Sequence, residues 1–89
     1  MADSRYRLAY DIAKMFEEFD PYGARDSLPD TDMTIEEGIE WAARETVDNR
    51  SALEWSLDEL ETMAADRWPG DPARVQALRE RFDKIWNVA

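Results

Sequence analysis

The chain has 89 residues, which suits one domain, and its 44% hydrophobic content is enough to form a core. It contains no cysteine and no histidine, which excludes disulfides, zinc–thiolate sites, thiol nucleophiles and the commonest general base. Its net charge of −10 opposes direct binding to nucleic acid or to anionic membranes.

The first amphipathic segment predicts a helix from about Ser4 to Phe19. Its apolar residues recur at helical spacing, and they are Leu8, Ile12, Met15, Phe16 and Phe19. Residues 20–33 contain two prolines, one glycine and four aspartates without a periodic pattern, so they predict a long acidic loop. An EF-hand would need an oxygen ligand and a glycine where Leu28 and Thr31 stand. We therefore expect no calcium site and no cofactor.

Residues 34–48 predict a second helix, because Thr34 and Glu37 have the spacing of a capping box. Its apolar stripe is narrow, and it consists of Ile35, Ile39, Ala42, Ala43 and Thr46. Ser51 and Glu54 have the same capping spacing and predict a third helix that ends near Arg67. The stripe of this third helix consists of Leu53, Leu57, Leu60 and Ala64.

Asp71 followed by Pro72 predicts the start of a fourth helix, because proline suits the first helical position. Its stripe is the strongest in the chain, and it consists of Val75, Leu78, Phe82, Ile85 and Trp86. Together the segments predict a single all-α domain over residues 1–89, a small bundle of about four short helices. A three-helix core with one displaced helix is the alternative.

Two tryptophans fall outside the apolar stripes. Advancing about 100° per residue places Trp41 between Glu37 and Glu45, and Trp55 near Asp58 and Glu59. Aromatic side chains surrounded by carboxylates are typical of anchors that bind a basic, partly apolar partner. Gly38, which has no side chain, would let that partner approach the backbone closely. The alternative is that both tryptophans belong to the core, because tryptophan is highly buried on average.

The acidic residues are concentrated in the middle of the chain. Residues 20–66 carry 14 acids and 3 bases, whereas residues 67–89 carry 3 acids and 5 bases. Carboxylates spaced along rigid helices can imitate the phosphates of a duplex, although most such runs are only a solvated surface. The candidate partner-binding residues are Glu36, Glu37, Glu40, Trp41, Glu45, Trp55, Asp58, Glu59 and Asp66.

The leading functional hypothesis is a non-enzymatic inhibitor of the DNA-mimic, anti-CRISPR or anti-restriction type, from a phage or mobile element. It would occupy a basic, nucleic-acid-binding surface of a partner protein and would not bind nucleic acid or a membrane itself. The alternative is an assembly module that forms a homodimer, or docks on a larger subunit, through exposed tryptophans. The N-terminal residues lack the apolar segment of a secretory signal, so we expect a cytoplasmic protein.

Overall fold

The computed structural model of the chain describes residues 4–26, 28–29, 32–66 and 71–86. These residues form no β-strand, and their five helices are α1 (Ser4–Phe19), α2 (Pro21–Asp26), α3 (Ile35–Thr46), α4 (Arg50–Asp66) and α5 (Pro72–Trp86). The predicted all-helical fold is confirmed, but the predicted count of about four helices is not, because α2 is an additional helix. Arg67, the predicted end of the third helix, lies outside the described residues.

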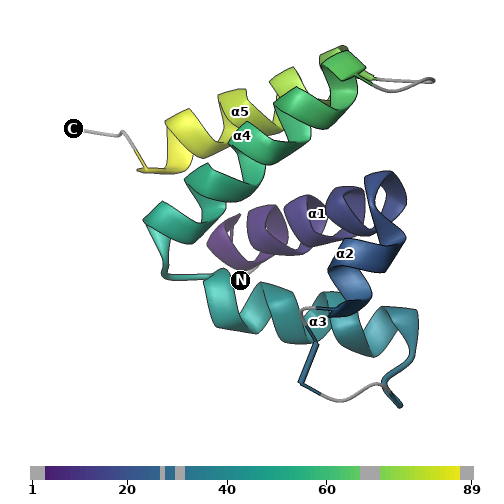
Figure 1. Cartoon of the computed structure of the whole chain (residues 1–89). Helices are drawn as coiled ribbons and strands as arrows, with labels where there is room; N and C mark the ends of the chain where they lie inside the picture. Colours follow the sequence, from purple (N-terminus) through teal and green to yellow (C-terminus); the bar gives the residue numbers. More distant parts are fainter. Residues whose placement is uncertain (1–3, 27, 30–31, 67–70, 87–89) are drawn as a thin grey trace.

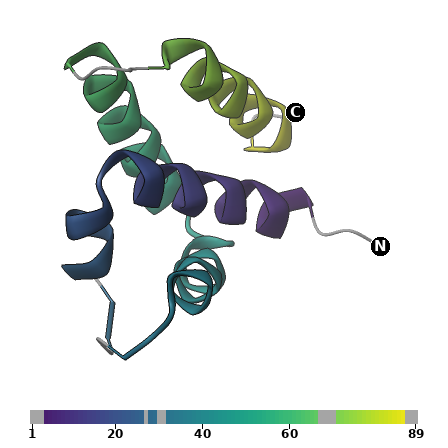
Figure 2. The ribbon, with the colours of Figure 1, turned by 90° about the vertical axis from the view of Figure 1, so that its right-hand side faces the viewer.

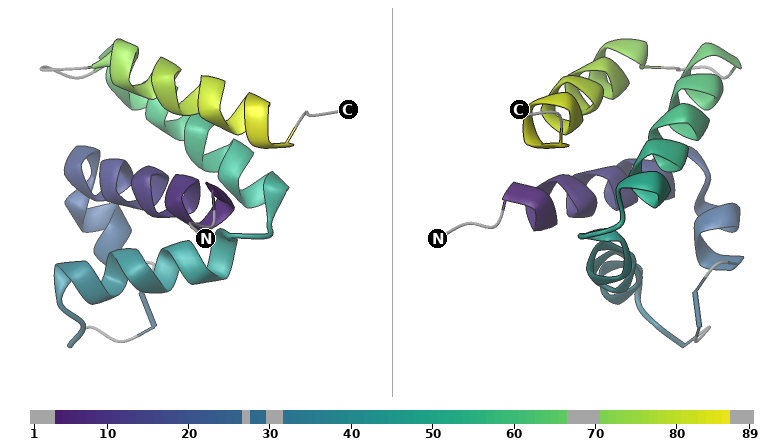
Figure 3. Two further views of the ribbon diagram at one scale, coloured as in Figure 1. Left: turned by 180° about the vertical axis from the view of Figure 1, so that it is seen from behind. Right: turned by 90° about the vertical axis from the view of Figure 1, so that its left-hand side faces the viewer.

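The helix α1 lies in the middle of the molecule and contacts each of the other four helices. The helices α2 and α3 lie on one side of α1, and the pair formed by α4 and α5 lies on the other (Figures 1 and 2). The helix α5 runs back along α4 (Figure 3). The Arg5 guanidinium lies 4.0 Å from the centre of the Trp86 ring, and this cation–π contact joins the first turn of α1 to the last turn of α5.

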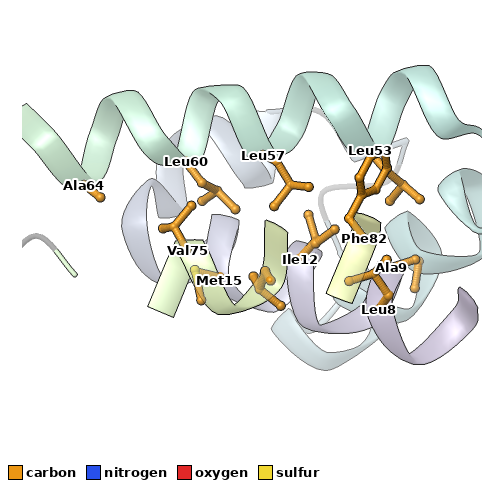
Figure 4. Close-up of a cluster of buried hydrophobic side chains, with 12 residues drawn as sticks. Leu8, Ala9, Ile12, Met15, Leu53, Leu57, Leu60, Ala64, Val75 and Phe82 are labelled. Atoms are coloured by element: carbon orange, nitrogen blue, oxygen red, sulfur yellow. The ribbon is translucent and has the colours of Figure 1, made fainter. Parts of the chain in front are cut away.

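The main core lies between α1, α4 and α5 (Figure 4). The predicted stripes supply it, and its buried members include Leu8, Ile12, Met15, Leu53, Leu57, Leu60, Ala64, Val75, Leu78 and Phe82. Burying each large aliphatic or aromatic side chain contributes about 1.5–3 kcal/mol, so these three helices hold most of the stabilising apolar surface. Four other stripe residues are only partly buried at its edge, namely Phe16, Phe19, Ile85 and Trp86.

The short helix α2 occupies the first half of the segment predicted as a loop. The Asp20 Oδ1 atom accepts a hydrogen bond from the Gly23 N–H at 3.0 Å, and the Asp20 carbonyl accepts one from the Ala24 N–H at 2.9 Å. Pro21 takes the first helical position, where a missing N–H leaves no hydrogen bond unmade. The prediction of one long loop over residues 20–33 is therefore wrong.

The start of α3 is the predicted capping box. The Glu37 N–H donates to Thr34 Oγ1 at 3.1 Å, and the Thr34 N–H donates to Glu37 Oε1 at 2.9 Å. Further along, Ile39 and Ala43 are buried as the stripe predicts. Ile35 is 54% exposed, which corrects its assignment to the core: it lies on the first turn and lines the groove described below.

The start of α4 differs from the prediction by two residues. The helix begins at Arg50, and the Ala52 N–H donates to Asn49 Oδ1 at 3.1 Å, so Asn49 is the capping residue. Ser51 lies inside the first turn, and the predicted capping box at this residue is wrong. The start of α5 agrees with the prediction, because the Arg74 N–H donates to the Asp71 Oδ1 atom at 3.3 Å.

Candidate binding groove

An apolar groove of about 270 Å³ opens between α1, α2, α3 and the first half of α4. Its principal apolar side chains are Ile12, Phe16, Ile35, Ile39, Trp41 and Trp55. The groove exists because α3 and α4, which both pack on α1, contact each other only weakly. The floor is therefore supplied by α1, and the two tryptophans come from different helices.

The Trp55 side chain is 59% exposed and rests on the ring of Phe16. The two ring centres lie 6.3 Å apart, and the planes are inclined by 22°. Such a stacked pair is worth about 0.5–1.5 kcal/mol beyond the area that it buries. The contact holds Trp55 against α1 while most of its surface stays open to solvent. The alternative hypothesis that Trp55 belongs to the core is therefore wrong.

Trp41 is half-buried and also lines the groove. Gly38, one turn earlier on α3, is buried rather than open to a partner. A Cβ atom on Gly38 would lie 2.9 Å from Leu28 Cδ1. The close approach that this glycine permits is thus made by a side chain of the same chain, which corrects the expectation that a partner would approach the backbone there.

Charged side chains border the apolar surface. Glu17 of α1, Arg25 of α2 and Glu45 of α3 are the charged residues among the described lining. Glu45 stands one helical turn after Trp41, and Glu59 stands one turn after Trp55. Among the described residues, no basic side chain lies within ion-pair distance of Glu17, Glu45 or Glu59.

Glu36 and Glu40 face a different neighbour. The Tyr10 hydroxyl donates a hydrogen bond to Glu36 Oε1 at 2.7 Å. This hydrogen bond, partial loss of water, and the negative charges of Glu36 and Glu40 raise the pKa of Tyr10 above its ordinary value. These two glutamates therefore lie at the contact between α3 and α1, and neither belongs to the lining of the groove.

The arginines of α5 pair with carboxylates of α1 and α4. Arg79 reaches Asp58 Oδ1 at 2.6 Å and Glu61 Oε1 at 2.8 Å. Burial disfavours the charge on Arg79, but the hydrogen bonds to both carboxylates outweigh this effect and raise its pKa. Two further pairs tie α5 to α1, between Arg74 and Glu18 and between Arg81 and Asp11, each at 2.7 Å.

Only some of the nine predicted site residues lie at the groove. The structure brings Trp41, Glu45 and Trp55 together in the lining of the groove, with Glu59 next to Trp55 on α4. Glu36 and Glu40 lie beside Tyr10, and Glu37 belongs to the cap of α3. Asp58 pairs with Arg79, and Asp66 is in the last turn of α4.

The predicted site residues omit the other apolar side chains of the groove, among them Phe16 and Ile35. Both belong to apolar stripes, and a stripe by itself predicts burial. The sequence held one indirect indication that part of α3 stays open to solvent. The apolar stripe of residues 34–48 is narrow, so this helix has too few apolar residues to require burial along its whole length. Ile35, at the first turn of α3, is the stripe residue that stays exposed.

Within the described ranges, no group of three or more acidic side chains is arranged to hold a metal ion. No helix of the same ranges is both long enough and apolar enough to cross a membrane. No protein-family model matches the chain, and neither a curated protein nor a solved structure does. The functional argument therefore rests on the groove and on the charges around it.

Proposed function

We propose that this protein is a non-catalytic binding protein that occupies a basic, nucleic-acid-binding surface of a partner protein. One observation supports it above the others: several exposed carboxylates of α3 and α4 stay without a basic neighbour, while the arginines of α5 pair with Asp58, with Glu61 and with carboxylates of α1. Among the described residues, Glu45, Glu54 and Glu59 have no cation within ion-pair distance. The negative potential at these residues is available to a partner.

The internal ion pairs make the proposed surface smaller than the sequence predicts. Asp58 and Glu61 share Arg79, so one of their two negative charges is compensated within the molecule. The remaining carboxylates would neutralise fewer basic groups on the partner, and fewer counterions would be released. We therefore expect binding that depends on salt but also needs an apolar contribution.

The test is displacement of DNA from basic proteins. A restriction endonuclease, a repressor and a CRISPR effector would each be loaded with fluorescently labelled DNA, and its release by the protein would be followed by anisotropy. We expect release from at least one of them at about 50 mM salt, and binding of the protein to that partner without DNA that weakens at least tenfold between about 50 and about 200 mM salt. No release from any of the three, or binding to the DNA-free partner that salt does not affect, would contradict the proposal.

A triple variant that neutralises Glu45, Glu54 and Glu59 as glutamines is the control. It keeps the side-chain volumes and removes the three uncompensated charges, so it should release much less DNA. Equal release by the variant and the natural chain would show that these carboxylates do not take part.

A homodimer is the second candidate, because Trp55 and Ile35, which are 59% and 54% exposed and line the same groove, leave apolar surface open. The net charge of −10 on each copy opposes self-association. Sedimentation at several protein concentrations separates the two candidates. A dimer that persists at low concentration and high salt would favour the assembly module.

A further inference from the structure

We propose that the groove receives one amphipathic helix of the basic partner. A bulky apolar side chain of that helix would rest against Trp41 and Trp55, and its lysine or arginine residues would face Glu45 and Glu59. This inference rests on the proposed function and adds to it the kind of segment that is recognised. It also assigns different roles to the two kinds of groove residue, apolar anchors and charged borders.

The first argument is the shape and chemistry of the groove. Its volume of about 270 Å³ is below the range of about 300–1,000 Å³ that is typical of sites for drug-sized ligands. A groove between helices suits the apolar face of another helix, which presents side chains at successive turns. One large side chain with its neighbours on the same face matches this limited space better than a separate small molecule does.

The second argument is that the anchor is already held in place. Trp55 stacks on Phe16 and is still 59% exposed. A side chain that is ordered before binding loses less conformational entropy on binding, so more of its contact energy appears as affinity. Tryptophan is also among the residues that most often dominate the energetics of interfaces.

The third argument is charge complementarity. Each tryptophan has a glutamate one turn later on its own helix, Glu45 after Trp41 and Glu59 after Trp55. Glu17 adds a third carboxylate from α1, against the single cation Arg25 in the described lining. A helix with an apolar face flanked by basic residues would satisfy both the apolar floor and this acidic border.

The same charges disfavour a second copy of this chain as the occupant. A symmetric dimer brings the same patch of both copies together, so the glutamates that border the groove in one copy would approach those of the other. Like charges placed opposite each other across an interface are costly. A basic partner meets no such penalty.

The experiment uses three synthetic peptides of about four helical turns each. The first has leucines on one face and arginines and lysines beside them; the second has the same composition in scrambled order; the third keeps the leucine face but carries glutamine in place of every basic residue. Dissociation constants would be measured by fluorescence anisotropy at about 50 and about 200 mM salt. We expect the first peptide to bind at least tenfold more tightly than either of the others.

Matched variants locate the binding surface. Trp55→Ala is compared with Tyr22→Ala, which removes an aromatic side chain that is 84% exposed and does not line the groove. We expect the first substitution to weaken binding of the basic amphipathic peptide at least tenfold and the second to have little effect. Reversal of both Glu45 and Glu59 to lysine is compared with reversal of both Asp66 and Glu80, which are exposed, do not line the groove and change the net charge equally. We expect only the first variant to weaken binding of the basic amphipathic peptide.

The outcomes distinguish this inference from the proposed function. Equal binding of the ordered and scrambled basic peptides, with equal effects of both charge-reversed variants, would overturn the groove proposal and leave a diffuse acidic surface. Tight binding of the glutamine peptide alone would overturn the basic partner while leaving the groove. A dimer that Trp55→Ala dissociates would identify a second copy as the occupant and overturn the inference. Circular dichroism of every variant confirms that the helices are retained.

Discussion

The side chain of Leu28 packs onto Gly38, where a Cβ atom would come within 2.9 Å of Leu28 Cδ1. This contact closes the back of the groove with a residue from the segment between α2 and α3. A residue that is usually unfavourable inside a helix thus leaves room for the Leu28 side chain.

A double-mutant cycle tests that contact. Alanine is better than glycine inside a helix by about 1 kcal/mol, so Gly38→Ala should stabilise the fold wherever no neighbour obstructs the methyl group. We expect this gain in a Leu28→Ala background and a smaller gain, or a loss, in the natural chain. Urea unfolding of the four proteins measures the difference. An identical effect in both backgrounds would mean that Leu28 does not restrict the space at Gly38.

The cap of α4 gives a second prediction. Asn49→Ala removes the side chain that accepts the Ala52 N–H, and it should lower the free energy of unfolding by about 1 kcal/mol. Ser51→Ala, inside the same turn, should change it by no more than a few tenths of a kcal/mol, because alanine is a good helix former. Thermal or urea unfolding of both variants is the measurement. The reverse order of the two effects would restore Ser51 as the cap.

Two neighbouring positions on α4 should respond very differently to truncation. Leu57 is fully buried, so Leu57→Ala should cost about 2–5 kcal/mol through lost burial and the cavity left behind. Trp55→Ala should cost about 1 kcal/mol, because the side chain is mostly exposed and loses mainly its stacking on Phe16. Urea unfolding compares the two variants. A large loss for Trp55→Ala would indicate that this tryptophan supports the fold rather than a binding surface.

Tyr10 gives a prediction in alkaline solution. Its pKa is raised in the folded protein, first by the hydrogen bond to Glu36. A group whose folded pKa is raised contributes stability below its unfolded pKa, which is about 10 for tyrosine, and loses that contribution as the pH rises through the folded value. The free energy of unfolding should therefore fall more steeply above about pH 10 in the natural chain than in Tyr10→Phe.

The Glu36→Gln variant provides the control for Tyr10. It removes the carboxylate charge and should return the Tyr10 pKa toward its ordinary value, as followed by NMR of the ring during a pH titration. If Tyr10 titrates at the same pH in the natural chain and in Glu36→Gln, the contact with Glu36 is absent in solution.

Local signals explain which helix boundaries were predictable. The capping box at Thr34 and the pair Asp71–Pro72 predict the starts of α3 and α5, and both predictions are confirmed. The pair Asp20–Pro21 has the same chemistry and starts α2, but Pro21 directly after a long amphipathic segment also indicates its end. One proline both terminates α1 and begins α2, and the sequence pattern alone favoured only the first reading.

Apolar periodicity by itself determined that this chain is helical and which faces of α1, α4 and α5 become the core, because these faces carry enough apolar surface to require burial wherever the helices pack. Charge counting determined that the molecule is acidic, but not where that charge stays uncompensated. Only the tertiary structure decided that Arg79 pairs with Asp58, that Leu28 covers Gly38, and that Trp41 and Trp55 meet at one groove. The physical reason is that each of these contacts joins residues from different elements, and their distances depend on how the helices cross rather than on spacing along the chain.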